Sequence, residues 1–126
     1  MEPFEMEGGN QLPTIILDQA KGHFEISGQS LPENVHEFYA PVISWLEQYG
    51  QNPNPETNVI FKMEYYNTAS SKMLFAILEK FDEIFKAGHN VKIFWHYDQD
   101  DEDMLESGED YADLVTAPFE FISYIV

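Results

Sequence analysis

The chain has 126 residues, a mass of 14.6 kDa and a formal net charge of -17, from 23 acidic residues against six lysines and no arginine. Such a charge repels the phosphates of nucleic acids and anionic lipid head groups, so DNA, RNA and membrane surfaces are excluded as expected partners. Cysteine is absent, which excludes disulfides, thiolate metal sites and cysteine nucleophiles.

Residues 1–12 are acidic and lack the basic and apolar segments of a signal peptide. They are expected to form a flexible arm. Residues 13–126 have the length of one domain, and a hydrophobic content of 44% supplies material for its core. No stretch approaches the roughly 20 apolar residues that cross a bilayer. We therefore expect a single domain in a cytoplasmic protein.

Hydrophobic spacing predicts a mixed α/β fold with the order ββαβαβαβ. The expected strands are 14–17, 23–27, 58–66, 91–97 and 118–125. The expected helices start after Pro32-Glu33-Asn34 and cover 35–49, 69–87 and 101–115. The first two strands are expected to form a hairpin around Lys21-Gly22. Pro41 is expected to kink the first helix or to split it, because a proline ring displaces a helical carbonyl group.

The strand over 58–66 alternates clearly. Val59, Phe61, Met63 and Tyr65 are expected to face the core, and the residues between them the other side. With the next helix and the strand over 91–97 it forms a βαβ unit, so the two strands are expected to be parallel. Their carboxyl ends then meet at one edge of the sheet, where sites collect in open α/β sheets.

A hydroxyl-rich turn lies at that edge. Thr68, Ser70 and Ser71 follow Asn67 at the beginning of a helix, where free backbone N–H groups and the helix dipole attract an anion. A phosphate on Thr68 would be held there, with Lys72 one turn further along. A helix cap formed by Asn67 or Thr68 is the simpler interpretation.

Nine of the sixteen residues from Asp98 to Asp113 are acidic. As a calcium loop, this segment would place its acids at the liganding positions, but Asp103 stands at the sixth position, where the sharp turn requires glycine. The apolar stripe through the segment favours a solvated acidic helix. A docking surface for a basic partner is a third interpretation.

Catalysis has little support in the residues. The four histidines are scattered, and neither a serine elbow nor a phosphate-binding glycine loop is present. His96 and Asp98 could form a couple at the end of a strand, which alone does not indicate an enzyme.

Three segments resemble the SiaC family of bacterial regulatory phosphoproteins. They are Gly28-Gln29-Ser30-Leu31-Pro32-Glu33-Asn34 with Glu37-Phe38-Tyr39 and Trp45-Leu46; Phe61-Lys62-Met63-Glu64-Tyr65-Tyr66-Asn67-Thr68-Ala69-Ser70-Ser71-Lys72; and Trp95-His96-Tyr97-Asp98 with the acidic residues up to Asp110. The resemblance runs from about residue 14 to about residue 121. It implies a fold similar to the STAS domains of anti-sigma-factor antagonists.

The resemblance also implies a regulatory protein without enzymatic activity, cofactor or small-molecule substrate. Thr68 would be phosphorylated by a serine/threonine kinase of the histidine-kinase-like ATPase type and dephosphorylated by a PPM-type phosphatase. The unphosphorylated form would bind and control a diguanylate cyclase or another effector in cyclic-di-GMP and biofilm signalling. Because the family's Asn-Thr-Ser-Ser is Asn67-Thr68-Ala69-Ser70-Ser71 here, Ser70 and Ser71 are secondary candidates for the acceptor.

Two alternatives stay open. One is an anti-sigma-factor-antagonist-type module that acts on a kinase only, and the other is an acidic regulator that binds a divalent cation. The residues expected to contact partners are Tyr66, Asn67, Thr68, Ser70, Ser71, Lys72, His96, Asp98, Asp100 and Asp101.

Overall fold

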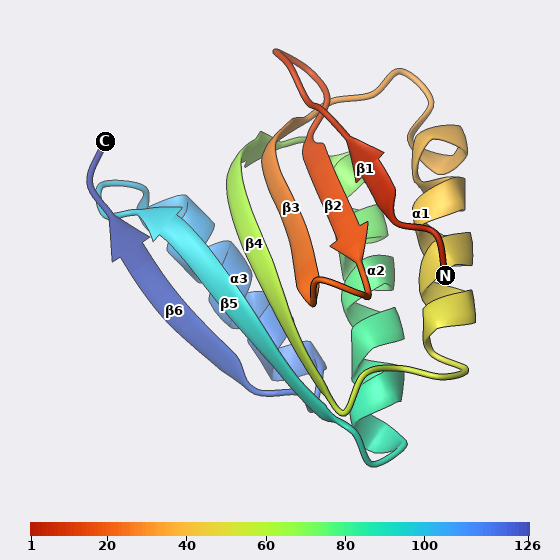
Figure 1. Cartoon of the computed structure of the whole chain (residues 1–126). Coiled ribbons are helices and arrows are strands. Elements are labelled where there is room, and N and C mark those ends of the chain that lie inside the picture. Colours follow the sequence, from red (N-terminus) through yellow and green to blue (C-terminus); the bar gives the residue numbers. More distant parts are fainter.

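The computed structural model describes all 126 residues and contains one six-stranded sheet with three helices (Figure 1). The elements are β1 (Phe4–Met6), β2 (Thr14–Asp18), β3 (His23–Ser30), α1 (Val35–Tyr49), β4 (Glu56–Tyr66), α2 (Thr68–Lys86), β5 (Asn90–Asp98), α3 (Glu102–Leu114) and β6 (Phe119–Tyr124). The expected mixed α/β fold is confirmed. No helix has both the length and the apolar character needed to cross a membrane.

The strands lie in the sheet in the order of the sequence. β1, β2 and β3 are antiparallel neighbours, whereas β3, β4, β5 and β6 are parallel neighbours, each joined to the next through a helix. Because crossovers between parallel strands are right-handed and the strand order never reverses, all three helices fall on the same face. Figure 1 shows this arrangement, which leaves the other face of the sheet without a covering layer.

The core fills the space between the sheet and the helices. Its largest fully buried side chains include Trp95, Tyr39, Tyr49, Phe24 and Phe61. The helix α1 begins where expected, and Asn34 caps it, because its side-chain oxygen accepts a hydrogen bond from the Glu37 N–H (3.1 Å). Gly88 follows α2 with φ at +107°, the left-handed conformation that favours glycine after a helix.

Pro41 does not split α1, so that part of the expectation is wrong. The helix runs without interruption from Val35 to Tyr49 and contains Pro41 on its exposed side. Buried side chains before and after the proline, such as Tyr39 and Val42, anchor both halves to the same core. Tertiary packing therefore offsets the loss of one helical hydrogen bond at this position.

The structure adds one strand to the expected order, at the beginning of the chain. β1 lies within the segment expected to be a flexible arm, and it pairs with β2, with Phe4 opposite Leu17 and Met6 opposite Ile15. The carbonyl oxygen of Glu2 also accepts a hydrogen bond from Trp45 Nε1 (2.8 Å). Phe4 and Met6 pack against the core. Three residues suffice for this strand because they pair with the existing edge strand β2.

The expected alternation of β4 fails at its end. The register between β3 and β4 shifts so that Gly28 faces Met63 and Gln29 faces Tyr65, which leaves Glu64 as an extra residue in the strand. Such a bulge turns the following side chains by one position. Tyr65, expected in the core, is 52% exposed, and the hydroxyl group of Tyr66 is buried instead.

Candidate functional site

The candidate site is the turn between β4 and α2, at the carboxyl edge of the parallel strands. Asn67 is the cap of α2, and its Oδ1 accepts a hydrogen bond from the Ser70 N–H (2.9 Å). Thr68 is therefore not the capping residue of α2. Thr68 is the first residue of α2, its side chain is exposed, and no hydrogen bond within the protein engages its hydroxyl group. Thr68 is therefore presented to solvent at a helix N-terminus.

Ser70 lies on the opposite side of the same turn, in a chain of buried hydroxyl groups. Its Oγ donates to the Ser30 carbonyl oxygen (2.9 Å) and accepts from Ser30 Oγ (2.9 Å), and Ser30 Oγ also contacts the Tyr39 hydroxyl (2.6 Å). Burial raises the pKa of Tyr39 to about 12. These bonds fasten the first turn of α2 to β3 and α1. Ser70 is fully buried, so neither a kinase nor another partner reaches it while the turn is folded.

Ser71 and Lys72 complete the first turn of α2. Ser71 is half-buried, and its Oγ donates to the Thr68 carbonyl oxygen (2.6 Å). Lys72 is exposed and forms no ion pair. Of the three hydroxyl groups expected at this turn, only that of Thr68 is both exposed and free of a hydrogen bond.

Two tyrosines connect this turn to α3. The Tyr111 hydroxyl donates to the Ser71 carbonyl oxygen (2.7 Å), and the Tyr111 ring stacks on Phe75 of α2 with 6.2 Å between centroids. Burial raises the pKa of Tyr66 and of Tyr111. The buried Tyr66 hydroxyl lies near Tyr111 and Ser107 without forming a well-aligned hydrogen bond. The sequence contains no signal for this role of Tyr111, because the residue occupies an ordinary apolar position of an amphipathic helix.

The acidic segment is a turn followed by α3. The Asp100 N–H donates to Asp98 Oδ1 (3.0 Å), and Asp101 caps α3 by accepting from the Met104 N–H (3.0 Å). Because residues 102–114 are helical, the disfavoured alternative of a calcium loop does not form, and no three acidic or histidine side chains converge on one point. The solvated acidic helix is the interpretation that the structure confirms.

His96 lies apart from the Thr68 turn. It projects from the face of β5 without helices, and it forms no hydrogen bond with Asp98, so the couple considered from the sequence does not form. Burial and the nearby Lys62 ammonium group lower the pKa of His96. His96 and Asp98 both lie on β5, and Asp100 and Asp101 follow that strand at the carboxyl edge of the sheet.

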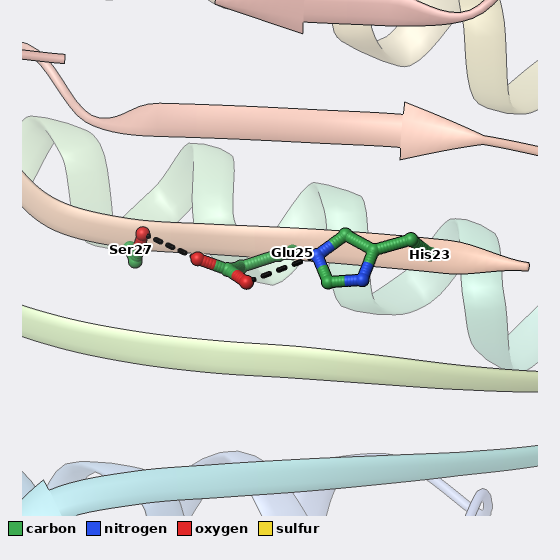
Figure 2. A network of polar contacts seen from close by, with 3 residues as sticks. All are labelled: His23, Glu25 and Ser27. Atoms are coloured by element: carbon green, nitrogen blue, oxygen red, sulfur yellow. Dashed lines mark hydrogen bonds and ion pairs between the residues drawn. The ribbon is translucent and has the colours of Figure 1, made fainter. Parts of the chain in front are cut away.

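The same face carries a row of three polar side chains along β3. Figure 2 shows Glu25 between His23 and Ser27, with His23 Nε2 3.1 Å from Glu25 Oε1 and Ser27 Oγ donating to Glu25 Oε2 (2.9 Å). In a nucleophilic site the histidine would contact the serine directly. Here the glutamate accepts from both, so the row does not activate Ser27.

Comparison with known proteins shows to which family the chain belongs. Residues 6–124 match the family described as SiaC family regulatory phosphoprotein. The chain belongs to the SiaC family. It is also 29% identical over 119 residues to an uncharacterized protein of Pseudomonas aeruginosa, covering 94% of both chains.

Solved structures of SiaC from Pseudomonas aeruginosa have the same fold. One is 27% identical in sequence and superposes with a TM-score of 0.88, covering 98% of this chain and 100% of that one. The apo form of SiaC is 28% identical with a TM-score of 0.89 over the same shares. A third structure contains SiaC as the activator of the diguanylate cyclase SiaD, in complex with it; there the TM-score is 0.88 at 28% identity, over 96% of this chain and 99% of that one.

Proposed function

We propose that this SiaC-family protein is a non-enzymatic regulator switched by reversible phosphorylation of Thr68. Its unphosphorylated form binds and controls a diguanylate cyclase. A serine/threonine kinase of the histidine-kinase-like ATPase type adds the phosphate, and a PPM-type phosphatase removes it. The observation that most directly supports this proposal concerns Thr68. The residue is exposed at the N-terminus of α2, and its hydroxyl group forms no hydrogen bond within the protein, while Asn67 provides the cap.

The physical basis of the switch is local charge. A phosphate adds about -1.5 to -2 charges at neutral pH. Capping by Asn67 engages the N–H of Ser70, which leaves the N–H groups of Thr68 and Ala69 for the phosphate. The helix is therefore expected to stay folded. Lys72 is the single cation in this turn, and the acidic helix α3 is joined to the turn through Tyr111. A phosphate on Thr68 therefore repels or obstructs a partner that docks across α2 and α3.

Substitution of Thr68 tests the switch. Thr68→Ala is expected to bind and activate the cyclase regardless of the kinase, whereas Thr68→Asp and the phosphorylated protein are expected to bind at least about tenfold more weakly, because charge is added within the interface. Binding and cyclic-di-GMP production by the host's cyclase are measured together. Intact-mass analysis with site mapping, on protein purified from the native host, locates the phosphate.

The matched control is Ser44→Asp on the exposed side of α1, which adds the same charge away from the turn and is expected to leave binding unchanged. Equal binding by Thr68→Ala and Thr68→Asp would contradict the proposal. Phosphorylation of Thr68 without any cyclase binding would instead support the module that acts on a kinase only.

Tyr65 is expected to be a contact of the same docking surface. Tyr65 is 52% exposed and lies three residues before Thr68 in the chain, and exposed tyrosines are frequent hot spots in interfaces. Tyr65→Ala is expected to change the free energy of unfolding by less than about 0.5 kcal/mol and to weaken binding of the cyclase by about 2 kcal/mol. Calorimetric titration and thermal unfolding of the same preparation separate the two effects. A large loss of stability would show that Tyr65 supports the fold instead.

A further inference from the structure

The sheet opens between β4 and β5 at their carboxyl ends. The pairing of these strands stops at Phe61 and Trp95, although β4 continues to Tyr66 and β5 to Asp98. Figure 1 shows the two strands diverging there. A hollow of about 780 Å³ lies at the divergence, on the face without helices. The facing edges of both strands therefore have no strand partner along this hollow.

Carboxylates surround the hollow. Its lining includes Glu25, Glu64, Asp98 and Asp101 and one cation, Lys62. Lys62 reaches across the divergence, with Nζ 4.8 Å from the ring centroid of Tyr124 on β6, and it forms no ion pair. Besides burial, the carboxylates of Glu64, Asp98 and Asp101 raise the pKa of Tyr124, which agrees with a negative potential inside the hollow.

The rest of the open face offers apolar contact. Ile60 and Phe94 are neighbours across β4 and β5, and Ile122 lies further along on β6, opposite His96; all three apolar side chains are only partly buried. Sheets of parallel strands are usually covered on both faces, and here one covering layer is missing. A second copy of the chain is disfavoured as the cover, because each copy carries a net charge of -17.

We propose that the open face, from the hollow to Ile60 and Phe94, is the docking surface for a basic, partly apolar segment of a partner protein. Lysine or arginine side chains of that segment enter the hollow between β4 and β5. Its apolar side chains cover the partly buried Ile60, Ile122 and Phe94. This surface goes beyond the proposed switch, because it involves neither Thr68 nor a phosphate.

A titration with a defined probe tests the chemistry. The probe is a short synthetic peptide in which lysine alternates with leucine, added to the isotope-labelled unphosphorylated protein and followed by NMR. Shifts are expected at Lys62, Glu64, Asp101 and Tyr124. A peptide with the same lysines but serine in place of leucine is expected to bind more weakly. Shifts centred on the exposed acids of α3, or equal affinity for both peptides, would overturn the proposal.

Two charge reversals separate docking from general attraction. Glu64→Lys in the hollow and Glu106→Lys on α3 alter exposed residues without hydrogen-bond partners and change the net charge equally. Glu64→Lys is expected to weaken binding of the lysine–leucine peptide about tenfold, and Glu106→Lys less than about twofold. Equal losses would overturn the proposal. The titration uses neither kinase nor cyclase, so its outcome is independent of the proposed function of Thr68.

Discussion

Replacement of Gly108 by alanine is expected to lower the free energy of unfolding by about 3 kcal/mol. A Cβ atom at this position would lie 2.5 Å from both Cδ1 and Nε1 of Trp95, far inside van der Waals contact. The indole ring cannot move away, because it is fully buried and stacks on Phe61 at 5.8 Å between centroids. Its Nε1 also donates to the Met104 carbonyl oxygen (3.0 Å). α3 must therefore lift off the sheet, which outweighs the better helix propensity of alanine.

Urea unfolding monitored by tryptophan fluorescence and circular dichroism measures this effect. Glu109→Ala, the adjacent exposed residue of α3, is the control and is expected to change the stability by less than about 0.5 kcal/mol. An unchanged urea midpoint for Gly108→Ala would show that the indole ring of Trp95 leaves room for a methyl group at position 108. The close approach of Trp95 thus explains why a glycine stands inside α3, although glycine inside a helix otherwise reduces stability.

Asp82→Ala is expected to cost about 3 kcal/mol as well, for a different reason. Asp82 is 4% exposed, and its Oδ1 accepts from the N–H groups of Thr116 (2.9 Å) and Ala117 (2.7 Å). These two bonds hold the connection between α3 and β6 against α2. Alanine would leave both N–H groups without this acceptor, and that of Ala117 is buried, where an unsatisfied polar group is costly.

Two further variants identify the responsible contact. Asp82→Asn keeps an oxygen acceptor and is expected to lose about 1 kcal/mol. Lys86→Ala removes only the ion pair with Asp82 Oδ2 (3.2 Å), and because the lysine side chain is 62% exposed, the expected loss is below about 0.5 kcal/mol. Thermal unfolding measures the stability of these variants. Equal losses of stability for Lys86→Ala and Asp82→Ala would show that the ion pair, and not the two hydrogen bonds to Asp82 Oδ1, holds this loop.

Local chemistry allowed most elements to be predicted. The strands and helices after residue 12 begin and end within three residues of the expected bounds, because alternation, helical spacing and caps such as Asn34 and Asn67 are properties of short segments. The βαβ unit also predicted correctly that β4 and β5 are parallel. The Thr68 turn could be singled out for the same reason, since a strand followed by hydroxyl residues and a helix is a local pattern.

Long-range contacts explain what was missed. β1 is too short to be recognised without the edge of β2 beside it. The bulge at Glu64 depends on the register between β3 and β4, so alternation alone placed Tyr65 in the core. Pro41 is tolerated because both halves of α1 are held by one core. The neighbours of Gly108 and Asp82 lie on other elements, which no local pattern reveals.

Composition and local pattern alone determined that this protein is an acidic α/β domain with a hydroxyl-rich turn at a strand end. Only the tertiary structure decided which hydroxyl group is available, because the neighbours that bury Ser70 come from β3 and α1. The strand order likewise decided that all helices share one face and that the other face stays open. Such arrangements depend on how elements pack against each other, and packing joins residues that are distant in the chain.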